Sequence, residues 1–438
     1  MKDTPIKFEI VEKKIKESGL KSVGDASIRE IKKLIDQIEA ASGEKFVRME
    51  MGIPGLPPTS IGVEAQKAAL DRGVAAVYPD IFGVASLKEQ ISKFVKNFMN
   101  VDVNPEGCIP TVGSMQGSFA AILTLNRMYA EREGTLFIDP GFPVHKQQLR
   151  VMGQGWDSFD VYNYRGEKLR EKLESYLSTG RFCSLLYSNP NNPSWICFTD
   201  TELRIIGELA NKYNIIVIED LAYFGMDFRK DYSKPGQPPY QPSVANYTNN
   251  YVLLISSSKA FSYAGERVGM MVISDKLFNT TAPDLLRYYR SENVGYALIF
   301  GSIYSLSSGT NHSAQYALTA ILEAANEGKL NFVEEVKEYG HKAKIMKKMF
   351  LENGFKIVYD MDEDEPIADG FYFTFAYPGL SGSELLEKLL YYGISAITLD
   401  ITGSERHEGI RACVSLVKRT QFPDLEFRLK KFHQDHKK

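Results

Sequence analysis

The sequence of 438 residues contains only four cysteines, and these are too scattered to form a metal cluster or a disulfide framework. Cys108, Cys183, Cys197 and Cys413 include no Cys-x-x-Cys pair. Zinc modules and small secreted domains use denser cysteine patterns. We therefore expect no bound metal and a reducing compartment, which we take to be the cytoplasm.

The sequence also lacks long apolar runs and an excess of charge of either sign. No run of roughly twenty apolar residues is present that could cross a membrane. Residues 1–21 mix Lys and Glu with single apolar residues, unlike an export signal. The 52 basic and 55 acidic residues leave a net charge of −3. Because this balance gives little attraction for nucleic acid or an anionic membrane, we expect neither partner.

Hydrophobic residues make up 44% of the chain, which is ample for at least one large core. Short apolar runs predict strands at 135–138, 184–187, 215–219, 251–256 and 270–273. Amphipathic stretches predict helices at 27–41, 114–129, 167–177 and 200–213. This alternation is typical of an α/β fold with a mostly parallel sheet between helices.

The pattern changes near residue 331. We expect one long helix over 331–353 and then strands at 355–359 and 370–377, whose alternation indicates one exposed face. These elements predict a second, smaller domain. We place an N-terminal segment that joins the small domain at 1–62, the large domain at 63–330 and the small C-terminal domain at 331–438.

Polar residues follow several of the predicted strands, where ligands bind in open parallel sheets. The runs in question are Ser-Asn-Pro-Asn-Asn-Pro at 188–193, Asp-Leu-Ala-Tyr at 220–223, Ser-Ser-Ser-Lys at 256–259 and Gly-Glu-Arg-Val-Gly at 265–269. Each run alone is weak evidence, because turns and surface loops contain similar residues. Four such runs in order at strand ends are strong evidence of one ligand site.

In this order the runs resemble the Asn-Pro-x-Asn-Pro, Asp-x-x-Tyr, Ser-x-Ser-Lys and Arg-x-Gly elements of the class I/II aminotransferase family. These are fold-type I enzymes that depend on pyridoxal 5'-phosphate (PLP), and aspartate aminotransferase is an example. The resemblance, over roughly residues 51–414, implies a large PLP-binding domain with a mostly parallel sheet of seven-stranded type, and a smaller α+β domain. It also implies transfer of an amino group between an L-amino acid and a 2-oxo acid.

The resemblance assigns the residues around the cofactor ring. Lys259 would hold PLP as a Schiff base, which requires an amine more nucleophilic than a free lysine with its pKa of about 10.4. Asp220 would keep the ring nitrogen protonated. Tyr223 and Asn192 would hydrogen-bond the ring oxygen, and Phe142 would stack on the ring. In part of the family, a histidine at the position of His145 supports the aspartate.

The phosphate of PLP needs N–H donors and a fixed positive charge, and Arg267 would supply the charge. The remaining phosphate ligands implied by the resemblance are the helix-opening residues Gly113, Ser114 and Met115 and the hydroxyls of Ser256 and Ser258. Tyr78, in a Tyr-x-x-x-x-Gly segment at 78–83, would reach the phosphate of a neighbouring subunit. The resemblance thus implies a homodimer with shared active sites.

The carboxylate of an amino acid suits the planar guanidinium of an arginine. Arg411, in the run Gly-Ile-Arg-Ala-Cys-Val at 409–414, resembles the family's carboxylate-binding arginine. Gly52 would add a backbone N–H, and Asn192 would also contact the substrate. Arg287 or Arg290 could meet a second carboxylate, although such a pair is more often a solvated helix face.

Two departures from the family pattern affect the expected pocket. The family usually continues with Thr-Gly after the second proline, whereas this chain has Ser194 and Trp195. Residues 398–403, Thr-Leu-Asp-Ile-Thr-Gly, also replace the usual Pro-Gly segment before the arginine. The sequence therefore leaves the substrate open. It also leaves a PLP-dependent C–S lyase as an alternative, while the presence of Lys259, Asp220 and Arg267 argues against a binding protein without turnover.

Overall fold

The computed structural model describes residues 4–437, which fall into two compact units. Unit 1 comprises Met1–Gly55, Asn192–Ile196 and Lys337–Lys438, as far as the described residues reach. Unit 2 comprises Leu56–Asn191 and Cys197–Val336. The chain therefore leaves unit 2 for five residues in its middle and then returns to it.

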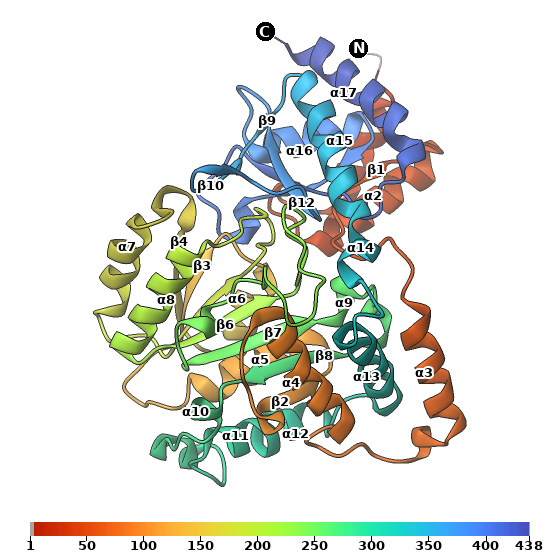
Figure 1. The fold of residues 1–438 in the computed structure, drawn as a ribbon. Helices are drawn as coiled ribbons and strands as arrows, with labels where there is room; N and C mark the ends of the chain where they lie inside the picture. The colour runs from red at the N-terminus through yellow and green to blue at the C-terminus, as the bar shows by residue number, and fades with distance from the viewer. Residues whose placement is uncertain (1–3, 438) are drawn as a thin grey trace. The chain divides into compact units, whose positions relative to one another are not determined.

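Unit 2 is built on a seven-stranded sheet with the strand order β2-β8-β7-β6-β5-β3-β4 (Figure 1). Only β8 runs antiparallel to its neighbours, so the expected mostly parallel sheet is confirmed. The strands are β2 (Cys108–Thr111), β3 (Thr135–Asp139), β4 (Trp156–Asp160), β5 (Ser184–Ser188), β6 (Ile216–Leu221), β7 (Tyr251–Ser256) and β8 (Gly269–Ile273). Strands β5, β6 and β7 are buried throughout, which explains their nearly continuous apolar sequences.

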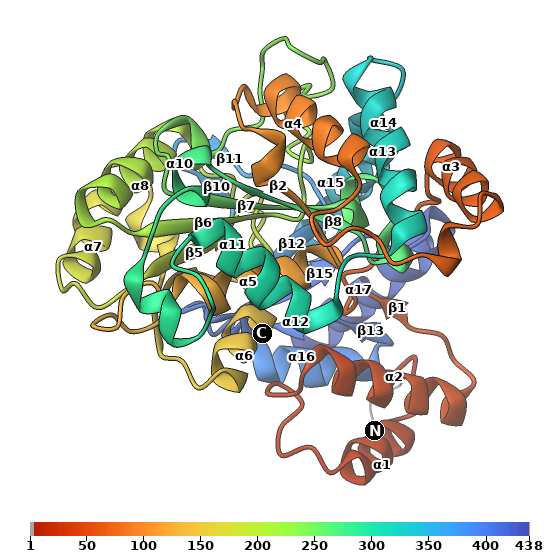
Figure 2. The same ribbon diagram turned by 90° about the horizontal axis from the view of Figure 1, so that it is seen from below.

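Helices cover both faces of this sheet. Figure 2 shows α4 and α5 on opposite sides of it, and α5 packs against β6, β7 and β8. The helices of unit 2 are α3 (Ser60–Asp71), α4 (Ala85–Met99), α5 (Gly113–Leu125), α6 (Pro143–Val151), α7 (Lys168–Leu177), α8 (Asp200–Tyr213), α9 (Ser257–Ala260), α10 (Asp275–Phe278), α11 (Val294–Tyr296), α12 (Tyr304–Ser307), α13 (His312–Asn326) and α14 (Phe332–Val336). Helix α8 begins after a capping box of Thr199 and Glu202, a local signal that made its start predictable.

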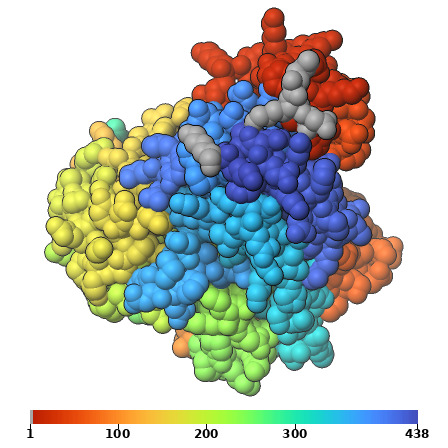
Figure 3. Space-filling view, turned by 90° about the horizontal axis from the view of Figure 1, so that it is seen from above, coloured from red at the N-terminus to blue at the C-terminus, as the bar shows by residue number. Residues whose placement is uncertain are grey.

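Unit 1 combines the two ends of the chain. Its four-stranded antiparallel sheet has the order β14-β15-β12-β9, and β1 pairs in parallel with β13. The elements are α1 (Phe8–Ser18), α2 (Ile28–Ser42), β1 (Val47–Arg48), α15 (Glu338–Glu352), β9 (Lys356–Ile357), β10 (Met361–Asp362), β11 (Glu365–Pro366), β12 (Tyr372–Ala376), α16 (Gly382–Tyr391), β13 (Ile394–Ser395), β14 (Ile397–Thr398), β15 (Ile410–Cys413) and α17 (Phe422–His436). Helices α1 and α16 are in contact, and Figure 3 shows the N-terminal segment, in red, against the C-terminal segment, in blue.

Two expectations for this region were wrong. The single helix over 331–353 is two helices, α14 and α15, separated at Lys337, where the chain passes from unit 2 to unit 1. Apolar periodicity continues through both helices, so it could not reveal the break. Strand β12 is buried along its whole length instead of exposing one face, because α15 covers Phe373 and Phe375 while Trp195 and Arg411 cover Tyr372 on the other face.

All four cysteines are free and buried. Within residues 4–437, no helix combines the length and the apolar character needed to cross a membrane. The same part of the chain brings no three His, Cys, Asp or Glu side chains into a cluster that could hold a metal ion.

Candidate active site

The strand register of unit 2 brings the sequence-predicted cofactor residues to one edge of the sheet. Ser188 at the end of β5 pairs with Asp220 in β6, and Leu221 pairs with Ile255 in β7. Because β8 is antiparallel, its first residue, Gly269, pairs with the last residue of β7 and with the last residue of β2. The turns that carry Asp220, Lys259, Arg267 and Gly113 therefore all leave the sheet at the same edge.

Asp220 is a buried carboxylate in need of a positive partner. Its side chain accepts a hydrogen bond from the Ala222 backbone N–H at 3.1 Å, and His145 Nε2 lies 3.7 Å from its other oxygen. Burial raises the pKa of Asp220 to about 7 and lowers the pKa of His145 to about 4. Because this histidine is neutral at physiological pH, Asp220 is suited to pair with a cationic ring nitrogen.

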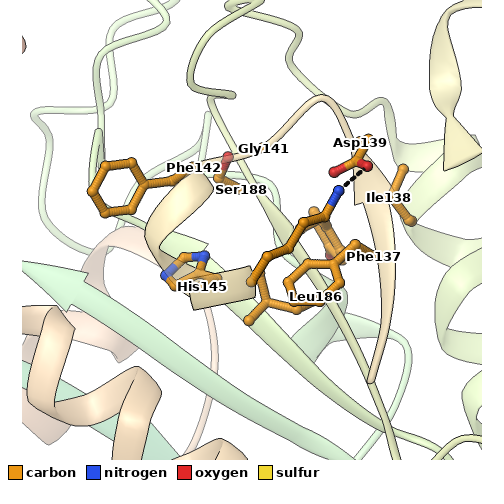
Figure 4. Close-up of a pocket in the computed structure, with 10 residues that line it drawn as sticks. Phe137, Ile138, Asp139, Gly141, Phe142, His145, Leu186 and Ser188 are labelled. Atoms are coloured by element: carbon orange, nitrogen blue, oxygen red, sulfur yellow. Dashed lines mark hydrogen bonds and ion pairs between the residues drawn. The ribbon is translucent and has the colours of Figure 1, made fainter. Parts of the chain in front are cut away.

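Phe142 and His145 border a small pocket that is also lined by β3 and β5 (Figure 4). Phe142 is the residue before α6, and its ring meets the His145 ring edge to face at 5.6 Å. Lys146, which also lines the pocket, forms an ion pair with Asp139. Burial nevertheless raises the pKa of Asp139 to about 6. The start of α6 therefore holds both an aromatic ring and the histidine that faces Asp220.

Lys259 lies in the short helix α9 directly after β7 and is half-buried. The Ser256 hydroxyl oxygen caps this helix by accepting a hydrogen bond from the Ser258 backbone N–H at 3.1 Å. Ser257 donates to the Val268 carbonyl, which ties the lysine turn to the segment before β8. Tyr223 follows β6 and is buried. The turn that carries Lys259 is thus held rigidly next to the strand of Asp220.

A cradle for an anion lies where α5 begins. Gly113 has a φ of 66°, and a Cβ at this position would lie 2.7 Å from Nη2 of Arg267. A Cβ at Gly269 would lie 3.1 Å from the Ser114 nitrogen. Arg267 is exposed and donates one hydrogen bond, to the Ala264 carbonyl at 2.8 Å. The first N–H groups of a helix have no partner inside it, so the turn and the guanidinium together fit a phosphate.

Unit 1 holds a separate cluster around Arg411 in β15. The guanidinium donates from Nη1 to Asn192 Oδ1 at 3.1 Å and from Nη2 to the Glu50 carbonyl at 2.6 Å. It lies over the ring of Tyr372, 4.5 Å from the ring centroid. Arg411 is only 1% exposed, and no carboxylate within residues 4–437 forms an ion pair with it. A buried cation without a carboxylate partner is suited to bind an anion.

The same cluster includes Gly52, since a Cβ built there would lie 2.0 Å from the Tyr372 hydroxyl oxygen. Sequence reasoning missed Tyr372 and the Glu50 carbonyl. Tyr372 lies in the strand expected at 370–377, but its position depends on the pairing of β12 with β15, where Cys413 is its partner. No local feature of the sequence predicts the register between β12 and β15.

The other predicted residues lie on the surface of unit 2. Tyr78 is 87% exposed, in the loop between α3 and α4. Arg287 and Arg290 are both exposed. Neither arginine is held in position the way Arg411 is, which fits their reading as a solvated face.

The geometry of the site agrees with the known proteins that this chain is similar to. A family model described as aminotransferase class I and II matches residues 49–417. A probable aspartate aminotransferase of Methanocaldococcus jannaschii is 25% identical over 381 residues, covering 85% of this chain and 88% of that protein. The LL-diaminopimelate aminotransferase of Natranaerobius thermophilus is 27% identical over 250 residues, covering 56% of this chain and 62% of that protein.

Solved structures show the same fold. An alanine aminotransferase from Pyrococcus furiosus matches with a TM-score of 0.76 and 18% identity, covering 94% of this chain and 98% of that one. A double mutant of Thermus thermophilus aspartate aminotransferase matches with a TM-score of 0.74 and 17% identity, covering 96% of this chain and 98% of that one. At these identities the likeness concerns the fold alone, and it confirms fold type I.

Proposed function

Because this chain belongs to the class I and II aminotransferase family, we propose that Lys259 is the residue that binds the cofactor covalently. The protein is a PLP-dependent aminotransferase, with an amino acid and a 2-oxo acid as its substrates. The observation that carries the proposal is the strand register, which brings the turns of Lys259, Asp220 and Arg267 to one edge of the sheet.

The residues present fit the cofactor. We assign its phosphate to the N–H groups of the Gly113, Ser114 and Met115 turn, the Arg267 guanidinium, and the hydroxyls of Ser256 and Ser258. Ser256 already accepts one hydrogen bond, but its own hydroxyl proton remains available to an anion. We assign the ring to Asp220 at its nitrogen, Tyr223 and Asn192 at its hydroxyl, and Phe142 at its face.

When bound, PLP supplies an electron sink for the pair left behind as the substrate Cα–H bond breaks. The Lys259 amine would accept the proton that leaves the substrate Cα and would donate it again as the amino group is transferred. Asp220 would stabilise the positive charge on the ring nitrogen of the cofactor, and the burial of Asp220 would strengthen this ion pair. Arg411 would bind the α-carboxylate, with help from the Gly52 N–H and Asn192, and would so fix the orientation of the substrate Cα.

We further propose that the enzyme is a homodimer in which Tyr78 reaches the partner subunit's cofactor phosphate. An exposed aromatic surface supports this. Phe82 packs edge to face on Phe300 at 5.0 Å, Tyr296 packs on the same ring at 4.6 Å, and the nearby Tyr304 is 57% exposed. Exposed aromatic clusters of this kind mark interaction surfaces.

Domain roles and location are also proposals. Residues 63–330 would form the large PLP-binding domain and 331–438 the small domain, with 1–62 joining the small one. Four free, buried cysteines support a reducing compartment such as the cytoplasm.

The alternative of a C–S lyase is not favoured, because the relatives named above are aminotransferases. A screen of amino donors with 2-oxoglutarate would identify the substrate.

Borohydride reduction of the PLP-saturated protein, followed by peptide mapping, tests the central assignment. We expect a single reduced adduct, on Lys259, and no transamination by Lys259→Ala. An adduct on another lysine, or none, would show that the assignment is wrong. The neighbouring variant Ser258→Ala serves as the control, since it should keep the adduct while binding the cofactor less tightly.

A further inference from the structure

Trp195 occupies a backbone position that suits glycine. Its φ is 66°, in the left-handed region that large side chains rarely adopt. It lies where the family pattern has a glycine, and it is completely buried. A tryptophan at such a position is retained only if its packing offsets the strained backbone, so the contacts of its ring indicate its role.

The Trp195 ring packs on β12 and the residue before it. A Cβ built at Gly370 would lie 1.9 Å from Cε2 of Trp195, so the indole lies directly on the Gly370 backbone. The ring also meets Tyr372 edge to face, with centroids 6.1 Å apart. All of these residues belong to unit 1, including the segment Asn192–Ile196 that carries Trp195.

Tyr372 in turn touches both residues proposed to bind the substrate carboxylate. Its ring face lies beneath the Arg411 guanidinium, and its hydroxyl lies against Gly52. The indole is therefore linked to the arginine through the Tyr372 ring.

We propose that Trp195 is a positioning residue that holds Tyr372 in place and thereby orients Arg411 toward the carboxylate of the substrate. This inference rests on the proposed function of Arg411. The cation–π contact keeps the buried guanidinium in one orientation while its remaining N–H groups face an incoming anion. Loss of the indole would let the Tyr372 ring turn and leave Arg411 charged but poorly aimed.

The test compares Trp195→Phe, Trp195→Gly and Tyr372→Leu with wild type, using Trp156→Phe in unit 2 as the matched control. For an accepted amino acid, Trp195→Phe should raise KM about tenfold with little change in kcat, and Trp195→Gly should lower kcat/KM about a hundredfold. Tyr372→Leu should resemble Trp195→Phe. The control should behave as wild type in both measurements.

A simple amine without a carboxylate distinguishes a positioning role from a purely structural one, because a structural defect would slow the reaction of the amine as well. Its slow half-reaction should be unchanged in all variants, as should the visible absorption of bound cofactor. Equal losses of activity with the amine and the amino acid would overturn the inference. So would an unchanged KM for the amino acid in a Trp195→Phe variant that melts at the same temperature as wild type. Should Trp195→Gly fail to fold, Trp195→Phe and Tyr372→Leu still decide it.

The two proposals fail separately. A wild-type protein that forms no reduced adduct at Lys259 contradicts the proposed function, whatever the Trp195 variants do. A wild-type protein that transaminates, with Trp195 variants that keep its KM for amino acids, contradicts only the positioning role.

Discussion

At the scale of single residues, burial decides the chemistry of the site. Asp220 and its neighbour Glu219 both have pKa values raised to about 7, since both are enclosed by the sheet. Glu219 accepts hydrogen bonds from the Ser243 hydroxyl and the Val244 N–H, at 2.5 and 3.2 Å, whereas Asp220 accepts one at 3.1 Å, from Ala222. Asp220 thus has fewer hydrogen bonds to offset its burial than Glu219 has, as expected if Asp220 pairs with the cofactor as proposed.

In the cofactor-free protein, Asp220→Asn should be more stable than wild type at neutral pH. The folded state holds the Asp220 proton up to about pH 7, while an unfolded Asp loses it near 3.8, so wild type loses stability as pH rises between these values. The difference should be near zero below about pH 4 and on the order of 4 kcal/mol at about pH 8. His145, with its pKa lowered to about 4, is neutral over most of this range and affects both proteins alike.

Chemical denaturation at several pH values measures this difference. A gap that does not change with pH would mean that Asp220 is already charged and paired without the cofactor. With PLP bound the order should reverse, because the carboxylate then has its cationic partner.

Arg411→Lys tests the carboxylate role at the same scale. The variant keeps the charge but loses the planar fork that binds two oxygens at once. We expect kcat/KM for amino acids to fall roughly 30- to 1000-fold, which corresponds to about 2–4 kcal/mol. The half-reaction of an amine without a carboxylate should be unaffected. If that reaction slows equally, Arg411 supports the fold or the cofactor instead.

At the scale of elements, the start of α5 and the turn before β8 form one structure. Glycines at 113 and 269 let the two backbones approach, and the Arg267 guanidinium occupies the space where a Gly113 side chain would project. The close approach therefore favours glycine at 269, and the positive φ favours glycine at 113.

Gly113→Ala should weaken PLP binding without removing any functional group. The added methyl group would displace Arg267 and strain a backbone at φ 66°. We expect the dissociation constant of PLP to rise roughly tenfold or more, about 1.4 kcal/mol. Gly155→Ala is the matched control, since a Cβ there meets nothing within 4 Å. Titration of the cofactor-free proteins with PLP, followed by absorbance, measures both. Equal affinities would place the phosphate elsewhere.

At the scale of the whole molecule, the exposure of Tyr78 has a simple explanation if its partner is a second chain. Its neighbour Phe82 is joined to the exposed aromatic surface through Phe300, so one interface would bury the surface and deliver Tyr78 to the other subunit. The repeat of the same contact by twofold symmetry would give two shared sites.

Mixing Tyr78→Ala with Lys259→Ala chains tests this arrangement. In a mixed dimer, one site combines the intact Tyr78 of one chain with the intact Lys259 of the other. Unfolding and refolding the two variants together should restore about a quarter of wild-type activity, because half of the dimers are mixed and each has one intact site. Activity no greater than the sum of the separate variants would contradict a shared site, and sedimentation analysis would show whether a dimer forms at all.

The sequence by itself determined the α/β fold, the mostly parallel sheet and the aminotransferase family. It could do so because β3, β5, β6, β7 and β8 are short apolar runs, whereas β2 and β4 were not predicted, and because the runs at 220–223 and 256–259 follow their strands directly. Such signals are local, and a chemical group immediately after a buried strand must lie at the strand's end. The residues that follow the strands could be predicted from the sequence for the same reason.

Only the tertiary structure decided which residues surround Arg411. Tyr372 reaches it through the pairing of β12 with β15, and Trp195 reaches Tyr372 because the segment Asn192–Ile196 joins a unit built from distant parts of the chain. The break at Lys337 and the full burial of β12 have the same origin. Contacts between residues far apart in sequence depend on register and packing, which leave no local periodicity to read.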